Sequence, residues 1–289
     1  MIVSGGLIMR FMMYILLFFV GCIVQPGTVT GQAREFSETV DFEPGGSLRI
    51  NTQRGTVKLT TWDQSQVEVL ARIEAPDGVS RSYAEEAVES AHIEVYGSNR
   101  SLTIRSVYDD VPYYDDDGDG WGHSRRIPYI YYEIRAPRQL NLDLEVERVN
   151  STLEGIEGRI HIESERGNID GRDWQGDIVM RLERGEVRLA NITGAIDLDL
   201  ERINVEIDRW QIDGDSRVTA ERGEVILELP EGQGFDLRAD VGSRSDFDSV
   251  FQITARNFRR NKIEGTINGG GPRLYLQGER TEFRLRQWR

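Results

Sequence analysis

The sequence has 289 residues, and its 49 Asp and Glu outnumber its 35 Lys and Arg, which gives a formal net charge of −14. Nucleic-acid binding depends on basic side chains that neutralise phosphates, and anionic lipid surfaces also attract basic segments. This balance therefore argues against nucleic acid and anionic membrane surfaces as partners. The length is sufficient for one large hydrophobic core.

The N-terminal segment has the composition of a signal peptide. An apolar stretch from Phe11 to Val24 follows Arg10 and precedes the polar, small residues 25–33. It is shorter than the about 20 residues that a membrane-spanning helix needs. We therefore predict a signal peptide over residues 1–33. A cut before Cys22, which would give a lipoprotein, is the alternative.

Cleavage has consequences for location and stability. The protein is expected to be extracytoplasmic, periplasmic or secreted, with no transmembrane segment after cleavage. Removal of residues 1–33 also removes Cys22, the only cysteine. The rest of the chain then depends on burial and backbone pairing rather than on disulfides.

Residues 34–139 are predicted to form an N-terminal β region of short strands. One helix is expected over residues 82–92, with Ser82 as its N-cap and Glu85 completing a capping box. Such a short helix is expected to cover a face or an end of the sheets.

An acidic and aromatic insertion over residues 108–126 interrupts this region. Asp115, Asp117 and Asp119 have the spacing of the first carboxylate ligands of a calcium loop. Arg126 stands where such a loop has its bidentate Glu. The insertion is therefore either a weak calcium site or the solvated tip of a hairpin.

Aromatic residues surround the acidic residues of the insertion. Tyr113, Tyr114 and Trp121 are the candidates for a surface that binds a glycan or a protein, because exposed rings cover apolar surface while neighbouring acids accept hydrogen bonds. The alternative is ordinary packing. It applies above all to Tyr129 and Tyr131, which alternate with other apolar residues along a predicted strand.

Residues 140–289 contain an internal repeat, marked by a recurring Glu-Arg dipeptide with steps of 18, 18, 18 and 20 residues. At these steps the dipeptide stands at Glu147-Arg148, Glu165-Arg166, Glu183-Arg184, Glu201-Arg202 and Glu221-Arg222. Each unit has two segments in which apolar and polar residues alternate. We therefore predict an all-β, β-solenoid-like stack of coils of about 18 residues with two strands each. A meander of antiparallel hairpins is the alternative architecture.

Three details complete the repeat. Gly167, Gly185 and Gly223 directly follow Glu-Arg and are expected to provide tight turns. The glutamate and arginine columns are expected to cross-pair between neighbouring coils as a structural row, not as an active site. A Gly-rich loop over residues 265–271 and the basic tail are expected to cap the stack. Residues 36–289 are expected to form one continuous domain.

The pattern resembles a bacterial family of adhesin-like proteins that contain domain of unknown function 4097 (DUF4097). The resemblance rests on residues 46–50, on residues 54–57, on the Glu-Arg-Gly-x-Val units and on residues 265–271. It implies a β-strand-repeat protein of the cell envelope, with adhesion as the associated function and no catalytic residues. The long Asp-rich insertion departs from the family's usual short connection.

Catalysis is the least favoured interpretation. The three histidines, His92, His123 and His161, have no spacing that predicts metal ligands or the base of a nucleophile. We expect a non-catalytic scaffold or binding module with no cofactor other than weakly bound calcium. Its expected partner is an unidentified envelope protein or polysaccharide. The alternatives are a structural or regulatory periplasmic sensor and, less favoured, a polysaccharide-active β-helix enzyme.

Overall fold

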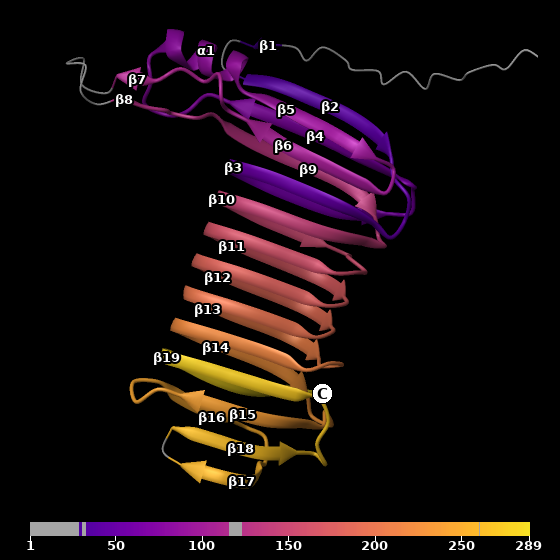
Figure 1. Ribbon diagram of the computed structural model, residues 1–289, viewed down its shortest axis with the longest axis vertical. Coiled ribbons are helices and arrows are strands. Elements are labelled where there is room, and N and C mark those ends of the chain that lie inside the picture. Colours follow the sequence, from indigo (N-terminus) through magenta and orange to yellow (C-terminus); the bar gives the residue numbers. More distant parts are fainter. Residues whose placement is uncertain (1–28, 31–32, 116–122, 260) are drawn as a thin grey trace, which may run out of the picture.

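The computed structural model describes residues 29–30, 33–115, 123–259 and 261–289 (Figure 1). The predicted signal peptide and the alternative lipidation site at Cys22 therefore fall almost wholly outside the described residues. No described helix has the length and apolar character needed to cross a membrane.

The middle of the chain is a stack of parallel strands (Figure 1). Each strand pairs in parallel with the next one, in register from one repeat to the following one. This confirms the solenoid-like all-β prediction and shows that the antiparallel meander is wrong for the repeat. The five strands are β10 (Leu140–Glu154), β11 (Ile160–Gln175), β12 (Ile178–Thr193), β13 (Ile196–Gln211) and β14 (Ser216–Pro230).

Each coil is one bent strand rather than the two separate strands that were predicted. Pairing continues through the bend, where Arg166 lies opposite Arg184 and Gly167 opposite Gly185. Gly185 has φ 143°, and a Cβ there would lie 1.9 Å from the carbonyl oxygen of Gly167. Only glycine tolerates that combination, so the Arg-Gly position forms the corner between the two sides of the coil.

The hydrophobic core fills the space between these two sides. The first side contributes the columns that contain Ile178 and Met180, and the second side contributes the column that contains Val187; all three residues are buried. The far corner is filled by a buried column in register, formed by Ile156, Trp174, Ile192 and Trp210. Period-two alternation thus places apolar side chains inside the coil and polar ones on both outer surfaces.

At the N-terminal end, spatial order departs from sequence order. β3 (Gly46–Trp62) pairs in parallel with β10, although residues 63–139 separate them in the sequence. Two separate strands form the next coil: one pairs with the first half of β3 and the other with its second half. They are β6 (Ser101–Val107) and β9 (Tyr129–Pro137), followed by the antiparallel strands β5 (His92–Ser98), β4 (Gln66–Glu74) and β2 (Ala33–Asp41), on which β1 (Val29–Thr30) pairs.

The helix α1 (Arg81–Ser90) lies at this end of the stack (Figure 1). Its N-cap is Ser80, whose hydroxyl accepts a hydrogen bond from the backbone N–H of Tyr83, so the prediction of Ser82 as the cap is wrong. Glu85 pairs instead with Arg81 at 2.8 Å. The capping-box spacing to Glu85 favoured Ser82, but the helix begins before that serine, at Arg81, and buries Tyr83 and three further apolar residues.

At the C-terminal end, β15 to β18 follow β14 in sequence, but the last strand of the chain lies between β14 and β15 in the sheet. β19 (Arg273–Trp288) pairs in parallel with β14 and also with β15 (Phe235–Val241) and β16 (Asp246–Ser249). The end of the stack is formed by β18 (Lys262–Ile267) and β17 (Thr254–Arg259), which are antiparallel. The basic tail is therefore an internal coil and not the cap, because its apolar alternation matches that of β14.

Candidate functional site: a solvent-facing groove around Tyr275

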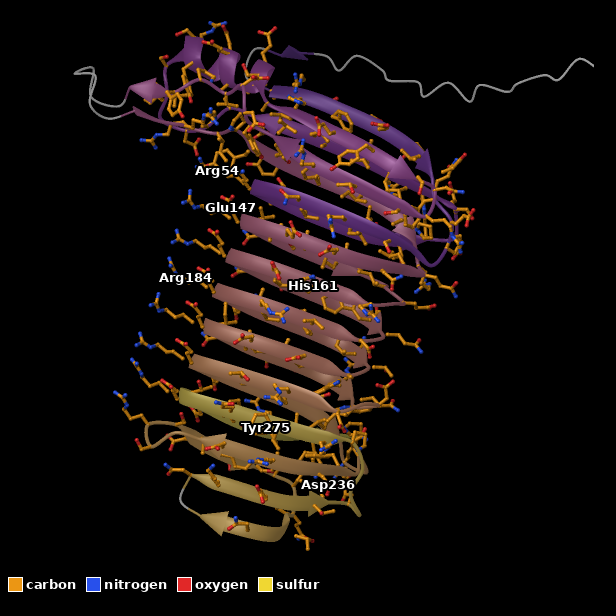
Figure 2. The ribbon with its side chains drawn as sticks, in the orientation of Figure 1. Arg54, Glu147, His161, Arg184, Asp236 and Tyr275 are labelled. Atoms are coloured by element: carbon orange, nitrogen blue, oxygen red, sulfur yellow. The ribbon has the colours of Figure 1, made fainter. Side chains whose placement is uncertain are left out.

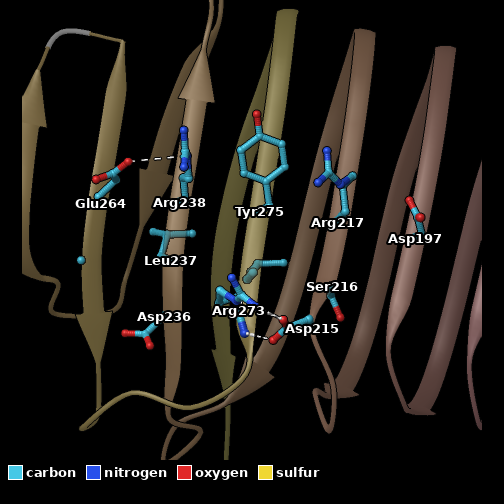
Figure 3. Close-up of a pocket in the computed structure, with 12 residues that line it drawn as sticks. Asp197, Asp215, Ser216, Arg217, Asp236, Leu237, Arg238, Glu264, Arg273 and Tyr275 are labelled. Carbon is cyan, nitrogen blue, oxygen red and sulfur yellow. Dashed lines mark hydrogen bonds and ion pairs between the residues drawn. The ribbon is translucent and has the colours of Figure 1, made fainter.

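A groove of about 730 Å³ lies on the outer surface where β13, β14, β19, β15 and β18 run side by side (Figure 3). It contains side chains of both charge signs around one aromatic ring. The charged and aromatic lining residues are Asp197, Asp215, Arg217, Asp236, Arg238, Glu264, Arg273 and Tyr275.

Strand register places Tyr275 between two arginines. Arg217 on β14 and Arg238 on β15 both lie opposite Tyr275 of β19. The Arg217 guanidinium is 4.6 Å from the centroid of the Tyr275 ring, and the Arg238 guanidinium is 5.7 Å from it. Both distances are in the range of cation–π attraction, so the Tyr275 ring lies between two guanidinium groups that can each attract it (Figure 3).

An exposed ion pair of Asp215 and Arg273 stands at one end of the groove (Figure 3). The Asp215 carboxylate accepts hydrogen bonds from the backbone N–H of Arg273 at 2.9 Å and from its Nε at 3.0 Å, and forms an ion pair with its Nη2 at 2.8 Å. The backbone hydrogen bond, followed by the side-chain bond, lowers the pKa of Asp215. This carboxylate is therefore ionised at neutral pH and is unsuited to donate a proton.

The rim of the groove is also arranged by contacts between strands. Arg238 Nε lies 3.5 Å from Glu264 Oε1, and Asp236 accepts a hydrogen bond of 2.8 Å from the hydroxyl of Thr266. The result is a shallow, open surface that offers a ring, guanidinium donors and carboxylate acceptors. Such a surface can bind a polar ligand by stacking and hydrogen bonding.

The sequence alone did not indicate this groove. Tyr275 has an ordinary place in an alternating strand, and Arg217 and Arg238 lie far from it in the sequence. The site arises because β19 inserts between β14 and β15. A usable signal was the match between the alternation of residues 273–288 and that of the 18-residue units, which predicts the same coil geometry.

The predicted aromatic surface is only partly described. Tyr113 is 62% exposed, and the Arg125 guanidinium lies 4.9 Å from its ring centroid. Tyr114 is half-buried, and its ring packs edge-on against Tyr83 at 4.8 Å between centroids. Trp121 lies outside the described residues.

The calcium candidates fall in the same segment. Asp115 belongs to β7 (Tyr114–Asp115), which pairs with β8 (His123–Ser124), while Asp117 and Asp119 lie outside the described residues. Across the part of the chain that the structure describes, no group of three or more His, Cys, Asp or Glu side chains is placed to hold a metal ion.

A second, acidic groove of about 560 Å³ lies along the glutamate column, which consists of Glu147, Glu165, Glu183, Glu201 and Glu221. Burial, and then the negative charge of Glu165, raise the pKa of Glu147. Within the described residues, no ion pair joins this column to the arginines that follow it in sequence, so the predicted cross-pairing between coils is wrong. Figure 2 shows Glu147 and Arg184 at the same corner of the stack.

Comparisons with known proteins were made on the whole chain. No protein-family model matches it, and neither does any curated protein. Two similar solved structures are a candidate cell-adhesion protein from Clostridium sporogenes and a candidate adhesin from Bacteroides fragilis. The first has 9% identity and a TM-score of 0.33, over 88% of this chain and 100% of that one. The second has 13% identity and a TM-score of 0.33, over 87% and 96%. Likeness at this level carries no argument about function.

Proposed function

We propose that this protein is an exported, non-catalytic, adhesin-like binding protein of the bacterial envelope, and that the Tyr275 groove is a ligand-binding surface. The observation that carries the proposal is the placement of Tyr275 between Arg217 and Arg238 on a rigid, solvent-facing sheet. A strand-borne ring with fixed donors and acceptors on both sides is preorganised, so a ligand does not need to order it.

Asp215 is poorly suited to act as a general acid in this groove. Asp215 is hydrogen-bonded to Arg273 and has a lowered pKa, whereas an acid catalyst needs a pKa near the working pH. The groove is also open along its length, so it suits an extended ligand that enters from the side. Polysaccharide or protein of the envelope is the ligand class we assign to it.

The test is capture by the purified protein of neutral and acidic polysaccharides and of detergent-solubilised envelope proteins. We expect that wild type retains one of these classes and that Tyr275→Ala weakens the retention at least tenfold. Tyr96→Ala is the matched control, because Tyr96 is 51% exposed on β5, far from the groove. Equal retention by Tyr275→Ala and wild type would remove the groove from the proposal.

Retention of none of these ligands would favour a structural or sensing role for the solenoid. The aromatic and acidic insertion is the second candidate surface, on the strength of the exposed Tyr113 beside Arg125. Tyr113→Ala in the same assay tests it. Loss of retention by this variant alone would move the binding surface from the Tyr275 groove to the insertion.

A further inference from the structure

One corner of the solenoid is a continuous row of arginines, called here the arginine ridge (Figure 2). Each member lies opposite the next in the strand register, so the guanidiniums follow the axis of the stack at intervals of about 4.8 Å. Its members are Arg148, Arg166, Arg184, Arg202, Arg222 and Arg280.

Within the described residues no ion pair ties the ridge to a carboxylate, although the charge of Arg148 acts on Glu147 and opposes the rise of its pKa. All six side chains are exposed, and none makes an ion pair or a side-chain hydrogen bond with another described residue. Two other arginines of these coils are paired: Arg188 with Glu186, and Arg284 with both Glu224 and Glu282. Like charges in a row repel one another, so the ridge costs stability in the absence of a ligand.

The residue type of the ridge is the same from coil to coil, whereas some other outward positions change. The column four residues after the ridge arginines contains Thr152, Asp170, Arg188 and Glu206, in register with one another. The ridge position is Arg in each coil from β10 to β19, including Arg280, which reaches the column after the excursion of β15–β18. The glutamate that precedes each ridge arginine is equally constant, so the two columns of this corner are kept together while positions further along the strand vary.

The flanks of the ridge show what else a ligand would meet. On one side lies the glutamate column, which offers acceptors. On the other side Asn150 and Asn168 use their side-chain oxygens to accept the backbone N–H of the next coil, at 2.9 and 3.1 Å. Asn204 does the same at 3.0 Å. The amide NH₂ groups of these asparagines are left to donate outward.

We propose that the arginine ridge binds an extended acidic polysaccharide that lies parallel to the axis of the solenoid. Guanidinium groups match carboxylates in bidentate geometry, and a regular ligand matches a regular row. Sugar hydroxyls between the carboxylates donate to the glutamate column and accept from the asparagine amides. The glutamate column repels any polyanion, so a chain whose charges are separated by neutral hydroxyl-bearing sugar atoms suits this corner better than a densely charged polyphosphate or nucleic acid.

At the N-terminal end of the ridge, the next arginine in the row already has a partner. Arg54 continues the row by register with Arg148, but its guanidinium lies 4.0 Å from the ring centroid of Tyr129 and donates to the Tyr129 hydroxyl. This arginine already has a partner beneath the insertion, so the open row begins at Arg148. The ligand therefore spans the six free coils.

The test is binding to immobilised polygalacturonate, hyaluronate and alginate, with neutral dextran and single-stranded DNA as further probes. We expect wild type to bind at least one of the carboxylated chains, with an affinity that falls as salt rises, and to bind dextran and DNA at least tenfold more weakly. The variant Arg166→Gln/Arg184→Gln/Arg202→Gln should lose at least tenfold in affinity. The corresponding Lys variant should recover only part of it, because lysine keeps the charge and lacks the fork.

Arg188→Gln is the matched control, because Arg188 is an exposed arginine of the same coil that is already paired. Absence of binding to all three carboxylated chains would overturn the proposal, and so would a triple Gln variant that binds like wild type. Preferred binding of DNA would assign the ridge to a different polyanion and also overturn it. Circular dichroism melting checks that the triple variant is folded.

The inference rests on the proposed binding function but uses a different surface from the Tyr275 groove. Tyr275→Ala should leave binding of the acidic polysaccharide unchanged. The two proposals can therefore fail separately, since each is tested by variants that do not touch the other surface.

Discussion

Arg49 and Asp143, which are 94 residues apart in sequence, form an ion pair of 2.8 Å on the outer surface of the solenoid. The pair shows that β3 is a coil of the stack, docked on β10 by register. An exposed pair of this kind contributes at most about 1 kcal/mol, whereas a buried Leu→Ala costs about 2–5 kcal/mol. Arg49→Ala should therefore hardly change the melting temperature, while Leu48→Ala, which empties a fully buried position beside it, should lower it clearly. Comparable effects of the two variants would show that β3 is held by surface charge.

Ile178→Asp should unfold the coils around it. Ile178 is 1% exposed and stacks between Ile160 and Ile196, so the aspartate would be a buried charge without a partner. The loss should exceed about 4 kcal/mol. Val179→Asp is the matched control, since Val179 is the next residue and faces outward. The measurement is urea unfolding followed by circular dichroism, and equal midpoints for the two variants would show that the inward column is assigned incorrectly.

Gly185→Ala should destabilise the corner through its backbone. The residue has φ 143°, and the added methyl group would meet the Gly167 carbonyl at 1.9 Å. We expect a cost of about 1–3 kcal/mol in the free energy of unfolding. Gly232→Ala is the control, because no atom lies within 4 Å of the Cβ position there. A neutral Gly185→Ala would mean that the bend does not depend on the conformational freedom of glycine.

Glu147→Gln should stabilise the protein at neutral pH. Burial and then the charge of Glu165 raise the pKa of Glu147 in the folded state above its ordinary value of about 4.3. As pH rises from the ordinary pKa of the unfolded chain to the raised pKa of the folded protein, the unfolded chain loses its proton first. The stability of the wild type therefore falls over this range and stays lower at neutral pH. Gln cannot ionise, so the gain, below about 1 kcal/mol at this partly exposed position, should vanish near pH about 3. Melting curves at both pH values, with Glu183→Gln as the comparison, measure it; a gain that persists in acid would contradict the assigned cause.

Replacement of residues 116–122 by Asn-Gly should leave the solenoid intact. Asp115 and His123 are paired across β7 and β8, and a two-residue turn can join such strands. The packing of Tyr114 against Tyr83 and the bond from the Tyr83 hydroxyl to the Pro112 carbonyl, at 2.7 Å, are kept. The melting temperature should change little. A calcium-dependent rise of the melting temperature in wild type that is absent from the variant would support the calcium site; the same rise in both would contradict it.

The repeat could be predicted from the sequence because its coils are equal. Each alternating segment indicates which side chains face inward, and Ile178 and Val187 are buried as their spacing predicts. The positions of β3 and β19 could not be predicted in the same way, because 77 intervening residues (63–139) and a four-strand excursion interrupt the period before the chain returns to the stack. The Tyr275 groove depends on that return, and the charge pairing at the corner depends on side-chain directions that the spacing does not indicate.

The insertion of β19 between β14 and β15 affects how the chain is completed. During synthesis β15–β18 emerge before the strand that attaches them to the solenoid. Until β19 arrives, β14 presents a row of unpaired backbone groups that could join another molecule. The stack is therefore completed by an intramolecular strand addition that comes last in the chain, and the edge of β14 is open to pairing with another molecule until that step.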